Sequence, residues 1–529
     1  MSRRKIAALD AETDPFEYGA DIQPFIWGLV EQNGTRHLFY ETDKMVEFLK
    51  DKDWIVYAHN GGKFDYHFML QHIADFEPVM IINGRLAKFK IGRCEFRDSY
   101  NIFPLPLAAF KKDEFDYNKM KKENRNKHMR EIIKYLFADC DYLLEIVTDF
   151  SERFGLNLTL AGSAMKQWNK ISGGTPETSD AYYQEFEPFY YGGRVQPFKT
   201  GIYKGDYSIY DINSAYPYAM LSNHPYGGLW ERISVYDGQP IKGINFYTIY
   251  GKSIGILPFR EANKLMFPND NEHRVFNISG HELLLYAKYT DDYKILSYKN
   301  CLSFTNFKDY IYHWYHIKNE SEKGSSDYLF AKLMMNSLYG KFGSNPDRYK
   351  EFEIIPNDCI LAHEATTDAV FAGQIGEKAL MASPLSDNKK RFYDVATAAS
   401  ITGFVRAYLY QNILNIQEKG GEVYYCDTDS IIIKDNKSAP AALDLGEELG
   451  QWDCEGHFDS IAIAGKKLYS LRYQNEAKYK TASKGVKLTP QEIFSVAQGN
   501  VETWKNIAPT FSLKRGVFYQ QRRVKMIDA

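Results

Sequence analysis

The chain has 529 residues, which is too many for one hydrophobic core and predicts several subdomains. Its 65 Lys and Arg against 68 Asp and Glu give a net charge of −3, which excludes a uniformly basic nucleic-acid-binding protein. The charge is uneven, however, because residues 463–525 hold 13 Lys and Arg against 3 Asp and Glu, a local +10 that suits either a phosphate backbone or a solvated basic tail.

The sequence predicts neither secretion nor a membrane segment. Its six cysteines have no paired metal-binding spacing, which favours reduced thiols in a cytoplasm. The basic residues at the N-terminus precede only a short apolar run at 6–9, which is too short for a signal peptide. No uninterrupted apolar stretch of membrane length follows.

In the first 140 residues, acidic side chains lie at the ends of predicted strands and on one predicted helix. A predicted strand ends in Asp10 and Glu12, which lie on one side because strand side chains alternate. A second predicted strand runs through a glycine turn into Asp65, and a predicted helix over 127–150 places Tyr135 and Asp139 one turn apart. Four carboxylates and a phenol could therefore converge, although each acid alone could be a surface carboxylate or a helix cap.

A second set of acids is spread over the rest of the chain. A short strand pattern ends in Asp211, and a predicted hairpin turn holds Asp427 and Asp429, which repel each other unless a cation lies between them. Mg²⁺ binds one or two carboxylates together with phosphate oxygens, so this pattern indicates phosphoryl transfer on a nucleotide. A lone acidic turn would be the simpler reading of the hairpin taken by itself.

Between these acids lies a predicted helix with one polar face. Lys332, Asn336 and Tyr339 or Gly340 share that face because helix positions three and four apart are neighbours. An ammonium, an amide and a ring in that order suit a nucleoside triphosphate and its base pair, although an ordinary amphipathic helix would give the same pattern.

Taken together, the segments 211–217, 332–340 and 425–430 resemble the first palm motif, the finger-helix motif and the second palm motif of family B DNA polymerases. The resemblance implies that Asp211 and Asp429 are the principal metal ligands, with Asp427 beside them. It also implies a ligand role for the carbonyl of Ile212. Two Mg²⁺ ions, or Mn²⁺, are then expected in each active site.

The resemblance extends to the nucleotide and to editing. It places the incoming nucleotide against Tyr216, Lys318, Lys332, Asn336 and Tyr339, where the ring of Tyr216 leaves no room for a 2′-hydroxyl. Lys318, on a predicted helix over 309–319, could equally be a solvated lysine. The N-terminal spacings resemble the three motifs of proofreading 3′–5′ exonucleases, which implies that Asp10, Glu12, Asp65 and Asp139 bind two ions and that Tyr135 orients the attacking water.

One branch of the family fits best, the protein-primed replicases of phages and linear plasmids, and residues 461–469 are closest to polymerases of tectivirus-type phages. The resemblance assigns DNA contacts to Asn60, Phe64, Ser99, Tyr100, Tyr190, Gly192, Gly193, Ser214, Ser337, Gly340, Thr402, Arg406, Lys467 and Tyr469, and more weakly a supporting role to Lys112. Two departures are visible. An extra residue separates Asn60 from Asp65, and Ala215 stands where leucine is frequent.

The expected fold is multidomain α/β and α+β. An RNase H-like 3′–5′ exonuclease domain (1–160) precedes a right-hand polymerase domain (161–529) with palm, fingers, thumb and two insertions. The expected parts are a connector with the first palm part (161–230), insertion 1 (231–305), fingers (306–350), insertion 2 (351–390), a second palm part (391–470) and a thumb (471–529). The resemblance implies that insertion 1 contacts a priming protein and the template, and that insertion 2 is a hairpin-like element around the downstream template. From the residues alone, insertion 2 could be a long surface loop.

The hypothesis is a monomeric DNA-dependent DNA polymerase with a proofreading exonuclease that replicates a linear genome by protein priming and strand displacement. Its expected partners are primer-template DNA, deoxynucleoside triphosphates and a separate terminal protein, with no membrane. A phage-encoded protein in the cytoplasm of a bacterial host is expected. The alternatives are an ordinary primer-dependent family B polymerase, a nuclease with an inactive polymerase half, and a non-catalytic replication scaffold.

Overall fold

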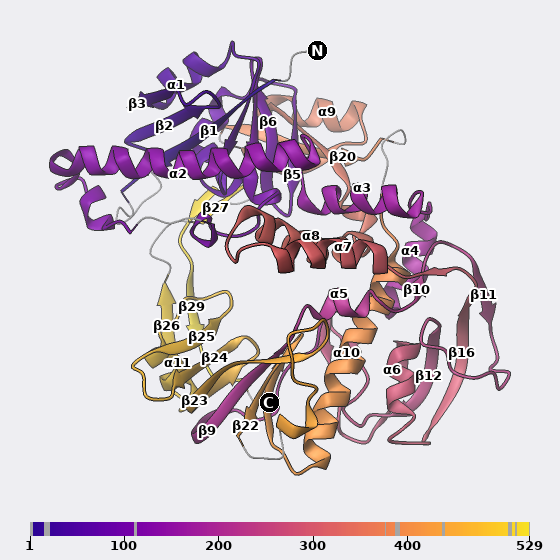
Figure 1. Ribbon diagram of the computed structural model, residues 1–529. Coiled ribbons are helices and arrows are strands. Elements are labelled where there is room, and N and C mark those ends of the chain that lie inside the picture. Colours follow the sequence, from indigo (N-terminus) through magenta and orange to yellow (C-terminus); the bar gives the residue numbers. More distant parts are fainter. Residues whose placement is uncertain are drawn as a thin grey trace.

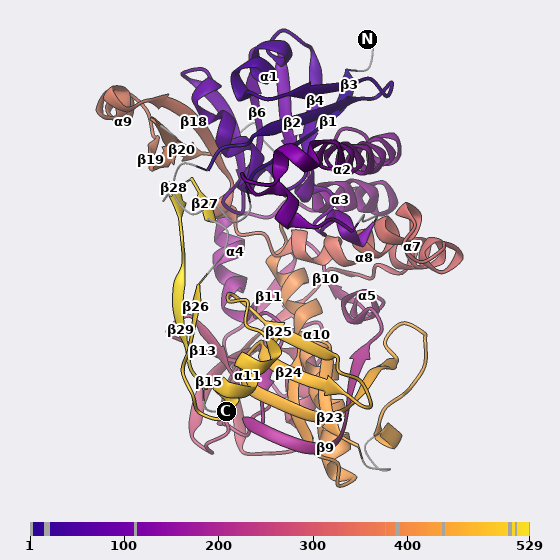
Figure 2. The ribbon, with the colours of Figure 1, turned by 90° about the vertical axis from the view of Figure 1, so that its left-hand side faces the viewer.

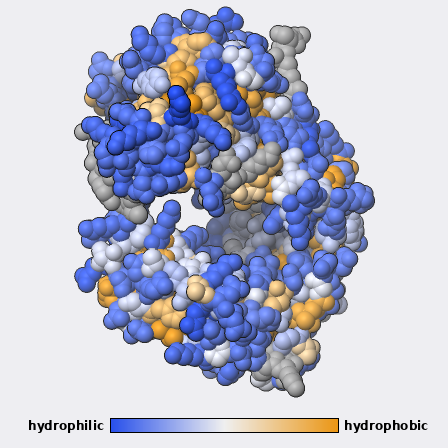
Figure 3. Space-filling view, turned by 60° about the vertical axis from the view of Figure 1, so that its left-hand side comes forward, coloured by the Kyte–Doolittle hydropathy of each residue, from blue (hydrophilic) through white to orange (hydrophobic). Residues whose placement is uncertain are grey.

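The computed structural model describes residues 4–14, 22–110, 114–375, 377–386, 392–435, 440–505, 510–513 and 516–527. Two halves face each other, with the N-terminal domain above and the palm and thumb below (Figures 1 and 2). An opening bordered mainly by hydrophilic residues separates the halves on one side (Figure 3). Within the described residues, no helix is long and apolar enough to cross a membrane.

The N-terminal domain is a mixed sheet with helices packed against it. Its elements are β1 (Lys5–Glu12), β2 (Ile26–Glu31), β3 (Arg36–Phe39), α1 (Thr42–Leu49), β4 (Trp54–Ala58), β5 (Glu77–Ile82), β6 (Arg85–Ile91), β7 (Cys94–Asp98) and α2 (Arg125–Phe154), with short 3₁₀ helices η1 (Gly61–Lys63), η2 (Asp65–His72) and η3 (Ser99–Asn101). Strand β1 pairs in parallel with β4, which pairs in parallel with β7. The carboxyl ends of these strands therefore meet at one edge, where the predicted acids lie. The helix predicted over 127–150 is confirmed as part of α2.

Insertion 2 continues the same sheet, which the sequence did not predict. It contains β18 (Lys350–Pro356), α9 (Ile360–Thr366), β19 (Val370–Ile375) and β20 (Lys378–Pro384), so the alternative of a long surface loop is wrong. Strand β18 pairs with β5 of the N-terminal domain and completes a ten-stranded sheet in the order β19-β20-β18-β5-β6-β7-β4-β1-β2-β3. Its C-terminal end, at 387–390, lies outside the described residues.

The palm is a seven-stranded antiparallel sheet in the order β25-β24-β23-β9-β22-β21-β8. The palm strands are β8 (Val195–Pro197), β9 (Gly201–Ile212), β21 (Val423–Asp427), β22 (Ser430–Lys434), β23 (Trp452–Gly465), β24 (Leu468–Tyr473) and β25 (Tyr479–Ser483), with helices α5 (Ala215–Ala219) and α10 (Val395–Glu418). Side chains of β9 alternate, so that Tyr207 and Ile209 enter one apolar cluster while Tyr210 and Ile212 enter the large central core. The predicted acidic hairpin is confirmed as β21 and β22.

The remaining parts surround the palm. A connector of α3 (Leu160–Ser172), α4 (Asp180–Phe186) and η6 (Glu187–Phe189) leads into it, and the fingers are α7 (Lys308–Glu320) and α8 (Ser326–Phe342). Strand β10 (His224–Pro225) precedes insertion 1 and pairs with its last strand. Insertion 1 contains β11 (Trp230–Ile233), β12 (Phe246–Lys252), β13 (Phe259–Glu261), β14 (Lys264–Met266), β15 (His273–Ser279), α6 (Gly280–Tyr286), β16 (Tyr293–Cys301) and β17 (Phe304–Thr305). The thumb adds α11 (Pro490–Ala497), β26 (Glu502–Lys505), β27 (Thr510–Ser512), β28 (Gly516–Phe518) and β29 (Gln521–Val524).

Candidate active sites

The palm brings together the three acids that the sequence singled out. Asp211, near the end of β9, stands opposite Ser430 of β22, and the main-chain N–H of Ile212 donates to the carbonyl of Asp429 at 2.8 Å. The turn closes because Thr428 adopts a left-handed φ of 63° and its N–H donates to the carbonyl of Arg194 at 2.7 Å. Two strands and one turn therefore fix three carboxylates at one end of the sheet.

These palm acids raise each other's affinity for protons. Burial, followed by the charges of Asp429 and Glu455, raises the pKa of Asp211 to about 8. Burial and the charge of Asp427 raise the pKa of Asp429 to about 6. A divalent cation would stabilise the ionised forms of both carboxylates, so this donor set suits a hard cation.

Asp427 is held differently from its neighbours. The ammonium of Lys467 binds both of its carboxylate oxygens, at 2.6 and 2.7 Å. Lys467 was expected to contact DNA, and in this structure its ammonium group forms an ion pair with Asp427. The ring of Tyr469, on β24, lies 4.9 Å from that of Tyr425, on β21, so this predicted contact residue packs close to the acidic turn.

The finger helices present the predicted nucleotide-binding side chains toward the palm. The rings of Tyr216 and Tyr339 stack 4.0 Å apart at 11°. Lys332 is exposed on α8 and lowers the pKa of Asp211, and Lys318 on α7 has its own pKa lowered by burial and by the charge of Lys332. Two ammonium groups therefore face one space in front of the carboxylates, which fits a triphosphate.

Within the described residues, the other predicted residues of α8 and of the first palm turn form no hydrogen bond with the palm acids that would show a role in binding the nucleotide. The side chains of Asn336 and Ser337 donate to carbonyls of their own helix, at 2.9 and 2.6 Å. A Cβ added at Gly340 would meet no heavy atom within 4 Å, so that face of the helix is open to a base pair. Ser214 has a left-handed φ of 53° and begins α5, which carries Tyr216.

The N-terminal domain assembles its four acids as well. Asp10 and Glu12 lie on β1, Asp65 begins η2, and Asp139 lies on α2. Burial first, and then the charges of the other three acids, raise the pKa of Asp10 well above its usual value. The pKa of Asp65 rises to about 7 through burial, although the N–H of Ala11 donates to this carboxylate.

Two buried carboxylate oxygens of this cluster suit divalent cations. Within the described part of the chain, no three His, Cys, Asp or Glu side chains already stand at metal-cluster spacing. Glu12 Oε1 and Asp65 Oδ1 are nonetheless buried without a hydrogen-bond partner, a costly state that a bound cation would relieve. Tyr135 lies beside this cluster, where its hydroxyl shares a hydrogen bond of 3.1 Å with that of Tyr117.

The predicted single-strand contacts lie around an arginine that the sequence analysis missed. The guanidinium of Arg85 donates to Asn60 Oδ1 at 2.5 Å and to Asp98 at 2.9 Å, and it covers the ring of Tyr100 at 4.3 Å. A single arginine at the start of a strand, here β6, gives no sign of this role in the sequence. Phe64 packs edge-on against Phe511 of the thumb, with ring centroids 5.5 Å apart.

Three residues that were predicted to contact DNA have buried side chains in this structure. Ser99 is fully buried and donates to the carbonyl of Ala58 at 3.2 Å. Thr402 and Arg406 are each 2% exposed. The guanidinium of Arg406 binds Glu282 at 2.8 Å and the carbonyls of the 191–192 linker at 2.6 and 2.9 Å. Lys112 lies outside the described residues.

The linker between the two halves touches both palm and fingers. A Cβ on Gly193 would lie 2.6 Å from Oγ1 of Thr428 in the acidic turn, so only glycine fits there. A Cβ on Gly343, just beyond α8, would overlap the hydroxyl of Tyr190. A Cβ on Gly192 would meet nothing within 4 Å. The linker, residues 190–193, therefore lies against both the acidic turn and the C-terminal end of α8.

A family model described as DNA polymerase type B, organellar and viral, matches residues 105–398. The DNA-directed DNA polymerase of Enterobacteria phage PRD1 is 34% identical over 98% of both chains. The chain belongs to the protein-primed family B DNA polymerases. The DNA polymerase of Bacillus phage phi29 is 26% identical over 79% of this chain and 74% of its own length.

Solved structures agree on the fold of this DNA-directed DNA polymerase. Phi29 DNA polymerase complexed with single-stranded DNA superimposes with a TM-score of 0.77, at 19% identity, over 99% of this chain and 100% of the other. The ternary complex of phi29 DNA polymerase with primer-template DNA and incoming nucleotides gives a TM-score of 0.76 at 18% identity. The expected multidomain α/β fold is confirmed.

Two charged residues beside the palm acids were also missed. Glu455 is the extra residue where the pairing of β23 with β9 shifts register, a β-bulge, and its carboxylate binds the ammonium of Lys480. Glu455 raises the pKa of Asp211 and Lys480 lowers it. A bulge redirects one side chain without any sequence signature, so spacing could not have identified this pair.

Proposed function

We propose that this polymerase copies DNA with two metal ions at the palm acids and edits with a 3′–5′ exonuclease in the N-terminal domain. The observation that carries the proposal is the presence of two separate clusters of buried or half-buried carboxylates, within each of which the charges raise the pKa values of neighbouring acids. A labelled primer on a single-stranded template with Mg²⁺ tests it. Growth with deoxynucleotides and shortening without them are expected, whereas a non-catalytic scaffold would leave the primer unchanged.

In synthesis, the primer hydroxyl attacks the α-phosphate of the nucleotide and pyrophosphate leaves. Bound Mg²⁺ would stabilise the charge that develops on the phosphate oxygens. The chain contributes by holding the triphosphate between Lys318 and Lys332 and by keeping Asp211 and Asp429 ionised for the cations. The stacked pair of Tyr216 and Tyr339 must open to admit the sugar and base, since their rings fill that space.

Sugar selection should therefore depend on Tyr216. Shortening it to valine removes the ring that would meet a 2′-hydroxyl, and the ratio of ribonucleotide to deoxynucleotide insertion should rise by about 10-fold or more. Single-nucleotide insertion kinetics measure the ratio. Tyr218→Val, on the same short helix, is the matched control and should leave it unchanged. An unchanged ratio in Tyr216→Val would mean that the ring only packs against Tyr339.

Metal binding should also depend on pH. The folded-state pKa values of Asp211 and Asp429 lie above the usual value of 3.8, at about 8 and about 6. The metal-free folded protein thus holds protons that the unfolded chain releases, and these groups reduce stability as pH rises from about 4 to about 8. Mg²⁺ displaces those protons, so it should raise Tm more at pH 8 than at pH 5. The comparison is made in protein with Asp10→Ala and Glu12→Ala, because the N-terminal acids also have raised pKa values. Equal shifts at both pH values, or an undiminished difference after adding Asp211→Asn, would contradict this.

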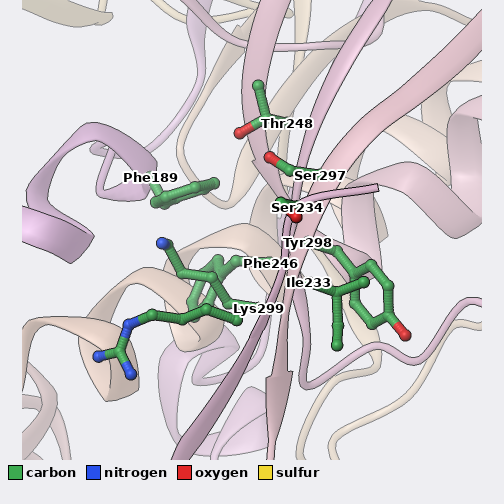
Figure 4. Close-up of a pocket in the computed structure, with 9 residues that line it drawn as sticks. Phe189, Ile233, Ser234, Phe246, Thr248, Ser297, Tyr298 and Lys299 are labelled. Carbon is green, nitrogen blue, oxygen red and sulfur yellow. The ribbon is translucent and has the colours of Figure 1, made fainter. Parts of the chain in front are cut away.

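We also propose that a separate terminal protein supplies the first hydroxyl and that insertion 1 receives it. The sheet of insertion 1 carries an open pocket of about 240 Å³ next to the connector, lined in part by Phe189, Thr248 and Lys299 (Figure 4). Incubation with the proteins of the same genome and labelled deoxynucleotide should label one of them covalently. If none is labelled, an ordinary primer-dependent enzyme remains. The PRD1 relative suggests a phage protein acting in a bacterial host.

Strand displacement is proposed for insertion 2. Removing all of it would uncover the edge of β5 and delete Ile354 from the N-terminal core, so a smaller change is needed. Replacing residues 357–368 with a short Gly-Ser linker removes α9 and keeps the paired strands. Products on single-stranded templates should stay long while synthesis stalls at duplex. If this variant still copied duplex templates to full length, α9 would not be required for strand displacement.

A further inference from the structure

The fingers do not stand free but are packed against the N-terminal domain. Exonuclease residues such as Phe103 and Phe150 and finger residues such as Leu329 and Phe330 belong to one continuous apolar core. The last turn of α2 also binds the first turn of α8, through an ion pair between Arg153 and Asp327. A helix held on one face by another domain cannot move without disturbing that domain.

One finger side chain is central to this contact. Phe330 is 2% exposed, and its ring lies 6.4 Å from that of Phe103, 5.7 Å from that of Phe150 and 5.8 Å from that of Phe154. Two residues further along α8 is Lys332, which is exposed toward the palm acids. Phe330 thus fixes the helix that carries a proposed triphosphate ligand.

The other side of the contact lies at the predicted single-strand site. Phe103 follows η3, which contains Tyr100, and its ring lies 6.3 Å from that of His59. His59 lies 5.8 Å from the ring of Tyr100, and its Nδ1 shares a hydrogen bond of 2.9 Å with Ser99. Phe103 therefore packs against the segment around Tyr100 that is expected to bind single-stranded DNA.

We propose that Phe330 is a positioning residue shared by both activities: through Phe103 it sets the hold of the exonuclease on single-stranded DNA, and through α8 it sets the hold of the fingers on the nucleotide. Movement of α8 onto a nucleotide would then loosen the single-strand site directly, in addition to any competition for the primer end. This inference rests on the exonuclease proposed above.

The test is the shortening of a single-stranded oligonucleotide with Mg²⁺ and without nucleotides. Phe330→Leu should raise KM for the oligonucleotide by about 3- to 10-fold while kcat changes by less than about 2-fold, since the ring touches none of the exonuclease acids. KM for the deoxynucleotide in primer extension should rise as well. Phe330→Met, which keeps most of the volume, should restore both values.

Phe342→Leu is the matched control. Phe342 is equally buried on the same helix but packs against Phe307 and Tyr226, at 5.6 and 6.2 Å. It should lower Tm to a similar extent and leave KM for the oligonucleotide unchanged. An unchanged KM in Phe330→Leu, or equal changes in the two variants, would overturn the inference. If Phe103→Leu and Phe330→Leu have fully additive effects on KM, the route through Phe103 is wrong. Absence of shortening by the unmodified protein would instead refute the proposed exonuclease.

Discussion

Asp429→Ala should reduce primer extension by at least about 10³-fold and leave primer shortening within about 2-fold of the unmodified protein. The carboxylate lies in the turn between β21 and β22 near Asp211, so its loss would remove one of the two proposed principal metal ligands. The N-terminal acids lie in another domain and are unaffected. Primer extension and shortening assays on the same labelled substrate measure both outcomes.

Asp459→Asn is the matched control for this change. Asp459 lies on the same sheet, where it forms an exposed ion pair with Arg472 at 2.7 Å, and such pairs contribute little. Extension by this variant should be unchanged. Loss of both activities in folded Asp429→Ala protein would contradict two separate sites.

The acids could be located from sequence because their spacing has a direct geometric meaning. Asp10 and Glu12 lie two positions apart, as do Asp427 and Asp429, and the strand period of two puts each pair on one side. The hairpin around Thr428 was predicted for the same reason, since apolar runs flank an acidic turn. Lys332 and Tyr339 were predicted from the helical period, and both face the palm site.

The sequence did not reveal the burial of some motif residues or the pairing of insertion 2 with the N-terminal sheet, and both have a physical reason. A motif shows which residues occur together but not which of them face solvent. Ser99, Thr402 and Arg406 lie in motif segments yet are buried, and the guanidinium of Arg406 donates to main-chain carbonyls of the linker. The pairing of β18 with β5 joins residues about 270 positions apart along the chain, and no local pattern encodes such a register.

The joined sheet changes how the two insertions should be understood. Insertion 1 has its own four-stranded sheet, in the order β11-β16-β12-β15, whose inner side chains, such as Ile249 and Ile278, belong to the central core. Insertion 2 shares a core with the N-terminal domain and with Phe511 of the thumb. Displacement and editing would therefore be carried by one rigid unit, so a variant of insertion 2 must be tested for shortening as well as for extension.

The second large effect concerns editing. Asp10→Ala combined with Glu12→Ala should reduce primer shortening by at least about 10²-fold and leave extension on a matched primer unchanged. Both carboxylates lie on β1 in the cluster whose charges raise one another's pKa, so removing both leaves too few ligands for two cations. The removal also relieves repulsion, and the variant should be at least as stable to heat as the unmodified protein without metal.

Glu131→Ala, on the exposed face of α2 where Glu131 binds Lys119, controls for charge loss in this domain and should shorten primers normally. On a mismatched primer the double variant should extend the mismatch that the unmodified protein removes. If the double variant shortened primers normally, Asp10 and Glu12 would not be part of the nuclease site.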